Sequence, residues 1–474
     1  MSKKIDWKKI EEWNSKYLMK CFATKDEYHW TPVERTEGDY LIMPDGTRLL
    51  DFFNQLYCVN VGQKNPKVVE YVKDALDRYG FVWDIYTTDY KATVAKLLLE
   101  DILGNAGWAA KIRYTNSGGE SVEVACIIAR LFTGKPLIAT REHAYHGVTA
   151  GAVSLNRVFA GRSHLSGGGN NTTVRQVPGQ NSGNAFVCPM PFCYRCSIGH
   201  TYPECKSCGS QLPCVLATER MILNHGVDQV AAIITEPAMG AGTIMPPDEY
   251  LSQIYEMTRR LGILWIVDEV LMGFGRLGKW FGHQKYGKDL KPDIMTVAKG
   301  ITSSQIPCGA VIVNKEIAEF MDSMRWNHVS TFAGHPIALA AAQGNLEYMI
   351  ENNIPKMAKK AGEYFGAKLK ELEEKHKTVG LVAGAGMFWQ VELVKNKETK
   401  EPFVPADRYT GFAGDTSKNP TGIILGKCLE KGVLLGGFVP NTLRVGASLT
   451  VSQADMDKAI DALEYALSYL DTMI

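Results

Sequence analysis

Short apolar runs alternate with longer amphipathic stretches through the middle of the chain. The runs are rich in branched side chains and cover residues 230–234, 263–267, 294–297 and 310–313. Continuous apolar runs of this length are typical of strands that are buried on both faces, as in a parallel sheet. Between them, residues 249–261 and 337–350 have the apolar spacing of amphipathic helices. The pattern therefore predicts an α/β region built on a mainly parallel sheet.

Both ends of the chain have a different pattern. Residues 33–53 form a polar, hairpin-like segment with a turn at Pro44-Asp45-Gly46. After Pro336 come a long helix, a charged helix over 355–376, strand patterns at 387–394 and 442–445, and a last helix that Ser452 and Asp455 begin in the manner of a capping box. We expect the two ends, residues 1–65 and 337–474, to form a small α+β domain beside a large domain of residues 66–336. A Ser-Gly-Asn tract at 166–171 is typical of a surface loop.

The composition excludes several classes of partner. The 474 residues include 52 basic and 51 acidic side chains, so the net charge is +1 and no long-range field favours a nucleic acid or an anionic membrane. No run of about 18 apolar residues predicts a membrane-spanning helix. The first 20 residues are charged and lack the apolar stretch of a secretory signal. We therefore expect a cytoplasmic protein whose partners are small molecules.

A segment rich in glycine and serine precedes a helical pattern. Residues 112–121 read Ile-Arg-Tyr-Thr-Asn-Ser-Gly-Gly-Glu-Ser and run into an apolar helical pattern over 122–131. The unpaired N–H groups and the positive end of the helix dipole favour an anion at such a start, and glycine lets the backbone come close. The segment predicts a phosphate site, although an ordinary helix cap would use the same residue types.

Two kinds of polar residue follow buried strands further along. An apolar run at 264–267 ends in Asp268 and Glu269, and Lys299 stands 31 residues after Asp268, close behind the run at 294–297. The carboxyl ends of strands are where α/β sheets bind ligands. Partial desolvation lowers the pKa of a lysine and exposes a nucleophilic amine, as Schiff-base chemistry requires. Taken singly, the acids could cap a helix and the lysine could reach solvent.

The three features together predict a site for pyridoxal 5'-phosphate. A phosphate site, a strand-end aspartate and a strand-end lysine, in that order, are the parts that this cofactor needs. We predict that Lys299 anchors it covalently as a Schiff base and that Asp268 is the partner of its pyridinium nitrogen. A carboxylate near that nitrogen favours protonation, which makes the ring an electron sink.

With these residues, the sequence resembles the class III, or ω-amino acid, aminotransferases of fold type I over nearly its whole length. The matching motifs are Asn116-Ser117-Gly118-Gly119-Glu120, Tyr145-His146-Gly147, Thr235-Glu236-Pro237, Asp268-Glu269-Val270, Gly273-Phe274-Gly275-Arg276, Ala298-Lys299-Gly300, the run at 331–336 and Leu443-Arg444-Val445. The resemblance implies a large domain with a mostly parallel seven-stranded sheet and a small α+β domain from both termini.

The resemblance also implies roles for individual residues. The phosphate would be held by Ser117, Gly118 and Gly119. Tyr145 would stack on one face of the cofactor ring and Val270 on the other, and Glu236 would lie near the ring hydroxyl. Thr331 would reach the phosphate of the cofactor in a neighbouring subunit. The resemblance therefore implies a homodimer with shared active sites, either alone or within a tetramer.

The implied reaction moves an amino group from an ω-amino donor to a 2-oxo acid with ping-pong kinetics. Relatives that act on ornithine or GABA carry a second glutamate five positions after the Glu-Pro glutamate, where it gates the carboxylate-binding arginine. Here that position is Ala241. Arg444 would then bind the carboxylate of an oxo acid or the acidic end of a donor. The candidate donors are taurine, β-alanine and GABA-like amines, with taurine preferred, and the acceptor would be 2-oxoglutarate or pyruvate.

The roles of two histidines remain open, and so do two other kinds of function. His335 stands where the family usually has Asn, and it could face a ligand or be a buried, satisfied side chain. His146 has the same ambiguity. The cofactor site could also serve an aminomutase, a racemase, a decarboxylase or a phospholyase. A non-catalytic binding protein that keeps the fold is an alternative of another class.

Six of the eleven cysteines crowd an insertion at residues 188–214. Cys193-x2-Cys196 and Cys205-x2-Cys208 have the paired spacing that binds zinc tetrahedrally. Such a zinc would be structural, because four thiolates leave no open position for catalysis. Unliganded thiols, a disulfide, and a metal site that uses Cys188 or Cys214 instead are the alternatives.

Overall fold

The computed structural model describes residues 5–19, 30–156, 184–209, 211–404, 419–439 and 441–474. The tract at 166–171, for which we predict a surface loop, lies outside the described residues. In this part of the chain, no helix combines the length and the apolar character that crossing a membrane requires.

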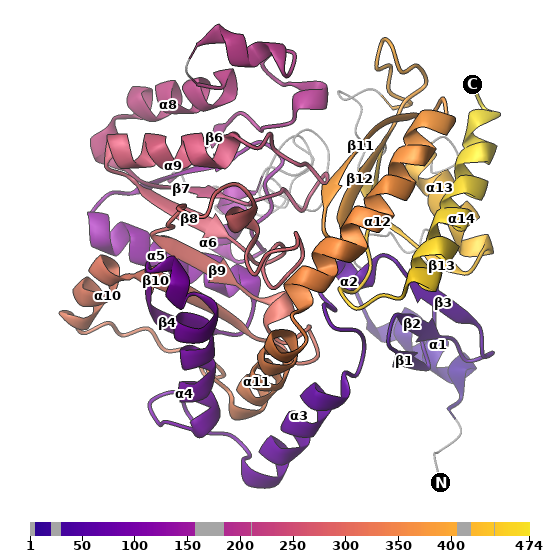
Figure 1. Ribbon diagram of the computed structural model, residues 1–474. Coiled ribbons are helices and arrows are strands. Elements are labelled where there is room, and N and C mark those ends of the chain that lie inside the picture. The colour runs from indigo at the N-terminus through magenta and orange to yellow at the C-terminus, as the bar shows by residue number, and fades with distance from the viewer. Residues whose placement is uncertain (1–4, 20–29, 157–183, 210, 405–418, 440) are drawn as a thin grey trace.

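A seven-stranded sheet forms the centre of the larger part of the molecule (Figure 1). In spatial order its strands are β4 (Ala109–Thr115), β10 (Gly309–Asn314), β9 (Ile294–Val297), β8 (Leu264–Asp268), β7 (Val230–Thr235), β5 (Leu137–Arg141) and β6 (Ala185–Cys188). Strand β10 is antiparallel to both of its neighbours, and the other pairs are parallel. The prediction of a mainly parallel seven-stranded sheet is confirmed.

Helices cover both faces of this sheet. They are α5 (Gly118–Thr133), α6 (Ala150–Leu155), α8 (Pro213–His225), α9 (Tyr250–Leu261) and α10 (Lys315–Asp322). Ile234 and Ile266 pack in one core cluster with side chains of α5, α6 and α10. Their neighbours Ile233 and Val267 pack in another cluster with side chains of α8 and α9. Successive strand residues thus face opposite apolar layers, which explains why these runs are apolar at every position.

Further helical segments lie outside these two layers. Three of them, α3 (Pro66–Arg78), α4 (Asp89–Lys96) and α11 (Pro336–Glu351), pack together at the bottom of Figure 1. The others are α1 (Trp7–Tyr17), α2 (Asn54–Tyr57), η1 (Leu97–Ile102), η2 (Gly104–Ala106), η3 (Cys193–Arg195), η4 (Glu204–Cys208), η5 (Val227–Gln229), η6 (Gly282–Lys285) and η7 (Lys299–Ile301).

The smaller part is built from both ends of the chain. One sheet has the order β1 (Arg35–Glu37), β2 (Tyr40–Ile42), β3 (Arg48–Asp51) and β13 (Val433–Leu434); the other has the order β11 (Val379–Ala385), β12 (Phe388–Leu393), β15 (Thr442–Val445) and β14 (Gly436–Val439). Strand β13 runs parallel to β3 and so joins the two termini. Helices α12 (Ile354–Lys375), α13 (Pro420–Glu430) and α14 (Gln453–Asp471) complete this part. The exact division into domains stays a prediction.

The last helix begins where the sequence predicts, with one difference. Ser452 Oγ accepts a hydrogen bond from the backbone N–H of Asp455 at 3.1 Å, and it donates to the Asp455 carboxylate at 2.7 Å. The serine therefore caps α14, while the Asp455 side chain binds the serine hydroxyl and not the backbone N–H that a capping box would use.

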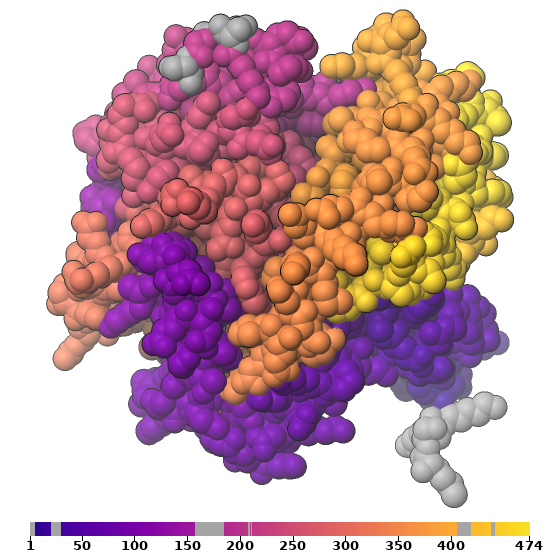
Figure 2. All heavy atoms as spheres, viewed as in Figure 1, coloured from indigo at the N-terminus to yellow at the C-terminus, as the bar shows by residue number. Residues whose placement is uncertain are grey.

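Helix α12 packs closely against the hairpin of β11 and β12. Both belong to the orange segment in Figure 2, which lies against the rest of the molecule. Gly362 in α12 is buried, and a Cβ there would overlap the carbonyl group of Gly386 at the hairpin turn. Gly426 in α13 is exposed and has open space around the position of a Cβ.

These two glycines make a matched pair for a stability test. Gly362→Ala should lower the free energy of unfolding by about 1–3 kcal/mol, because the helix must move away from the hairpin. Gly426→Ala should raise it by roughly 0.5–1 kcal/mol, because alanine is the better helix former and meets no atom. The shift in thermal unfolding midpoint measures both changes. Equal shifts in the same direction would contradict this account of the packing.

Candidate active site

A cavity of about 370 Å³ opens at the carboxyl ends of β7, β8 and β9 and at the N-terminus of α5. This edge of a parallel sheet is where α/β proteins bind ligands. The cavity brings together the predicted residues Ser117, Gly118, Gly119, Tyr145, Glu236, Asp268, Val270, Lys299 and Arg444. They come from segments up to 327 positions apart, since the first is 117 and the last 444.

The start of α5 has the form of an anion site. Ser117 is the N-cap, and its Oγ accepts a hydrogen bond from the backbone N–H of Glu120 at 3.2 Å. The helix then begins with Gly118 and Gly119, whose backbone N–H groups have no partner within the helix because they belong to its first turn. An anion at this end would gain these donors and the helix dipole.

Close approach explains the glycines around this helix start. A Cβ on Gly118 would lie 2.6 Å from Cγ1 of Val270. A Cβ on Gly147 would lie 2.5 Å from the Cα of Gly119, and Gly147 has a φ of +122°. The loop after β5, the helix start and the turn after β8 can therefore meet only because these positions lack side chains.

Asp268 ends β8 and is only 4% exposed. Its Oδ2 lies 2.7 Å from Nδ1 of His146, and its Oδ1 accepts hydrogen bonds from Val270 N–H at 3.0 Å and Thr296 Oγ1 at 3.2 Å. His146 is buried, and among the residues that the structure describes its Nε2 finds no hydrogen-bond partner. The contact with His146 thus fixes the orientation of the Asp268 carboxylate.

Glu236 ties the loop after β5 to the end of β7. Its carboxylate accepts hydrogen bonds from the backbone N–H of Tyr145 at 3.3 Å and of Gly240 at 2.7 Å. Burial raises the pKa of Glu236, while His146 and Arg141 act in the opposite direction. This backbone bond fixes the loop at Tyr145, and the Tyr145 side chain lines the same cavity as Val270.

Lys299 has an unusual backbone and an unusual charge environment. It follows β9 with a φ of +44°, a conformation that costs a non-glycine residue about 1–3 kcal/mol unless its surroundings impose it. Burial lowers the pKa of its amine, and the Arg444 guanidinium lowers it further, whereas Asp268 and Glu236 act in the opposite direction. An uncharged amine is the nucleophilic form.

Arg444 lies on β15 and is 5% exposed. Its guanidinium is 4.5 Å from the ring centre of Tyr57, and the guanidinium of Arg276 is 5.4 Å from the same ring. Burial lowers the pKa of both arginines. Ala241 lines the cavity as well.

Tyr57 ends a left-handed turn without glycine. Residues 54–57 have φ values of 49°, 45°, 70° and 57°, a region that disfavours every residue with a Cβ. Asp51 Oδ1 accepts N–H bonds from Phe53 and Asn54, and Arg276 donates to Asn54 Oδ1 at 2.9 Å. The turn places Leu56 in the cavity and Tyr57 between the two arginines. Sequence reasoning missed this element, because nothing in Asn-Gln-Leu-Tyr predicts such a backbone.

Two predicted residues lie outside the cavity lining. Thr331 is exposed and stands next to Ser330, whose Oγ donates to Glu120 Oε1 at 2.5 Å. Its proposed contact with a second subunit stays a prediction. His335 is the N-cap of α11, where Nδ1 accepts a hydrogen bond from Ile337 N–H at 3.3 Å. Of the two interpretations of His335, the structure favours the satisfied side chain.

His146 and Thr296 are contacts of Asp268 that sequence reasoning left out of the site. The Tyr-His-Gly motif gave a signal for His146, but not its target, because residues 146 and 268 meet only through the sheet. The apolar lining from Leu56, Val148, Leu271 and Met272 was also missed, since single apolar residues carry no chemical pattern.

The predicted cysteine ligands lie in the insertion, away from this cavity. Cys193, Cys196 and Cys205 line a small second cavity, together with Cys214. The side chain of Cys208 lies outside the described residues. No group of three or more His, Cys, Asp or Glu side chains in the described chain is arranged to hold a metal ion as it stands.

Comparison with known proteins identifies the family. The family model described as aminotransferase class-III matches residues 22–467. The chain belongs to the class III aminotransferases. It is a pyridoxal-phosphate-dependent enzyme, which agrees with the predicted fold, reaction and cofactor.

Individual relatives show how the similarity is distributed. An S-selective transaminase from Bacillus megaterium has 53% identity with a TM-score of 0.91, and the match covers 99% of each chain. A taurine:2-oxoglutarate aminotransferase from Bifidobacterium kashiwanohense, solved with PLP and glutamate, has 27% identity, a TM-score of 0.88 and coverage of 99% of each chain. A putrescine–pyruvate aminotransferase from Pseudomonas aeruginosa has 31% identity, and the match covers 90% of this chain and 88% of that one. A leucine/methionine racemase from Thermococcus litoralis also has 31% identity, and the match covers 88% of this chain and 86% of that one.

The charge environment of Lys299 makes a pH prediction. Because burial and Arg444 both lower its pKa, the amine is uncharged at a lower pH than an exposed lysine, whose pKa is about 10.4. In cofactor-free enzyme, the rate of covalent reaction with pyridoxal 5'-phosphate should rise with pH and level off below that value. Arg444→Gln removes a positive charge, favours the ammonium form and should move the plateau to higher pH.

Stopped-flow absorbance in the visible range measures this rate. Arg260→Gln is the matched control, because Arg260 pairs with Glu219 at the surface at 2.7 Å and does not line the cavity. Its profile should equal that of the unsubstituted enzyme. An unchanged profile in Arg444→Gln would show that the arginine does not influence the amine.

Proposed function

We propose that this enzyme transfers the amino group of a primary amine to a 2-oxo acid, with Lys299 as the cofactor anchor and Arg444 as the carboxylate site. The observation that carries the proposal is the convergence of Lys299, Asp268 and Arg444 on one cavity that also holds a glycine-rich helix start. The family supports the reaction class, and the choice of residues and substrates is our inference.

The cavity residues fit pyridoxal 5'-phosphate. The Cβ-free surface at Gly118 and Gly119, with the helix N-terminus behind it, would hold the phosphate. Tyr145 and Val270 would contact the ring, and Glu236 would lie near its hydroxyl. When bound, the cofactor supplies an electrophilic carbon and a ring that withdraws electrons.

The protein's own groups would then hold and move charge. Asp268, fixed by His146 and Thr296, favours a positive charge on the nitrogen that faces it. Lys299 Nζ, with its lowered pKa, can accept a proton from substrate carbon and return it.

The lining bears on the choice of substrate. Leu56, Val148, Leu271 and Met272 give the cavity an apolar surface, while Arg444 can bind a carboxylate or a sulfonate. Apolar side groups and one acidic group could therefore both be accommodated. The 53% identity with an S-selective transaminase, against 27% with the taurine enzyme, favours (S)-configured amines as donors. Taurine, β-alanine and GABA-like amines are the second choice.

A panel of donors and acceptors tests this function. With pyruvate or 2-oxoglutarate, the enzyme should consume an (S)-configured arylalkylamine faster than its (R) form and faster than taurine, with the parallel-line kinetics of a ping-pong reaction.

Asp268→Ala should lower turnover by about 100-fold or more, because it removes a preorganised charge. Coupled product assays give the rates. Lys285→Ala, which removes a surface partner of Asp248, is the control.

The same panel separates the rival reactions. A racemase, like the relative from Thermococcus, would invert a single amino acid without any oxo acid. Amino transfer needs the acceptor and yields one aminated product for each amine consumed. Inversion of a chiral amino acid in the absence of an acceptor, with no aminated product when an acceptor is added, would contradict the proposal.

We also propose that the enzyme is a homodimer with Thr331 at the interface. A group of exposed apolar side chains supports this: Phe81, Trp83, Ile85, Tyr86, Val329 and Phe332 are 39–71% exposed. The rings of Phe81 and Phe332 lie 6.0 Å apart, so the two segments form one patch beside Thr331. A contiguous apolar patch of this kind is typical of a protein interface.

The double substitution Ile85→Asp and Phe332→Asp should shift the mass measured by light scattering from dimer to monomer. Leu216→Asp, at an exposed leucine of α8 outside the patch, should leave the mass unchanged. Thr331→Ala should keep the dimer but weaken cofactor retention by about 10-fold, as expected for one hydrogen bond to a charged group. A monomeric unsubstituted enzyme would refute the proposed assembly.

A further inference from the structure

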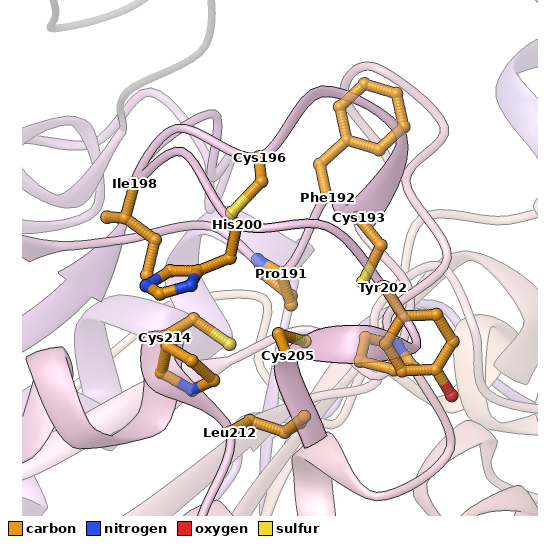
Figure 3. A pocket seen from close by; sticks show the side chains of 12 residues that line it. Pro191, Phe192, Cys193, Cys196, Ile198, His200, Tyr202, Cys205, Leu212 and Cys214 are labelled. Atoms are coloured by element: carbon orange, nitrogen blue, oxygen red, sulfur yellow. The ribbon is translucent and has the colours of Figure 1, made fainter. Parts of the chain in front are cut away.

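Four cysteine side chains surround one small cavity in the insertion, as Figure 3 shows. They are Cys193, Cys196, Cys205 and Cys214, and the cavity between them measures about 20 Å³. This is room for about one water-sized sphere. His200 and Tyr202 line the same space, and the remaining lining is apolar or proline.

The fold brings these cysteines together from separate turns. Cys193 begins η3 and Cys196 follows it directly, so the first pair forms a tight knuckle. Cys205 comes from η4. Cys214 comes from the first turn of α8, which begins at Pro213.

The closeness of these four sulfurs suits a cation. Thiolates that share one small space repel each other, and a divalent cation between them would remove that repulsion.

We propose that Cys193, Cys196, Cys205 and Cys214, which line one cavity, bind one zinc ion. Zn²⁺ prefers four thiolates in a tetrahedron with Zn–S distances of about 2.3 Å. Since the side chains do not yet form such a group, they must turn inward onto the ion. Each thiol gives up its proton as its sulfur binds.

The proposed zinc site has a structural neighbour that it would stabilise. Arg195 stands between Cys193 and Cys196, and its Nε donates to the buried Glu392 of β12 at 2.7 Å. Its guanidinium also donates to the carbonyl of Lys400 at 2.8 Å. A metal that fixes the knuckle would fix Arg195, and with it the contact between the insertion and the smaller part of the molecule.

Metal analysis of the full-length holoenzyme tests the site. Protein produced with zinc in the medium should contain one zinc per chain after desalting, and exchange with Co²⁺ should give the intense visible absorption of a tetrahedral cobalt–thiolate centre. Cys214→Ser should lose this stoichiometric binding. Cys208→Ser should keep it, and so should Cys188→Ala, a buried cysteine of β6 that does not line the cavity.

A second measurement avoids substitutions that could unfold the protein. In the unsubstituted enzyme, a chelator should expose four further thiols per chain to an alkylating reagent, and peptide mapping should find them at 193, 196, 205 and 214. Absence of zinc and of the cobalt spectrum from this enzyme overturns the proposal. Loss of the metal in Cys208→Ser with retention in Cys214→Ser overturns the choice of the fourth ligand.

Discussion

The buried guanidinium of Arg276 is the contact on which the geometry of this enzyme depends. It donates to the carbonyls of Met387 and Ala447 in the smaller part, and to Asn54, Tyr57 and Asn60 near the N-terminus. Three segments far apart in sequence thus share one cation. A buried charge is stable only while its hydrogen bonds are made, so these segments have a single favourable arrangement around it. The arrangement fixes the position of the two parts relative to each other.

The active site inherits its shape from this contact. Arg276 helps to hold residues 54–57 in a left-handed turn that they would not adopt alone. This left-handed turn places the Tyr57 ring against Arg444 and places Leu56 in the cavity. Lys299 is another strained residue of the site, with β9 before it and η7 beginning at it. Strain of this kind persists because the surrounding packing over-determines the backbone.

Charge is distributed over the cavity in a way that suits amino transfer. The amine of Lys299 and the guanidinium of Arg444 repel each other, while Asp268 and Glu236 offset part of that repulsion. The result is an amine that loses its proton more easily than that of an exposed lysine. The cysteine insertion lies apart from this chemistry, but Arg195 connects it to β12, the neighbour of the strand that carries Arg444. The insertion therefore contributes to the enzyme by helping to position β12 and, through it, β15.

The amino-acid sequence by itself determined the α/β class, the central sheet, the cofactor and nine of the eighteen residues that line the cavity. Local patterns indicated the sheet, the helix start, Asp268 and Lys299, because strand burial, helix starts and strand-end polar residues are properties of short segments. The resemblance to the family supplied residues such as Tyr145 and Glu236. The sequence did not reveal that His146 supports Asp268, that residues 54–57 turn left-handed, or that Cys214 lines the cavity of the cysteine insertion in company with three others. Only the tertiary structure decided these, because each depends on contacts between segments that no spacing along the chain records.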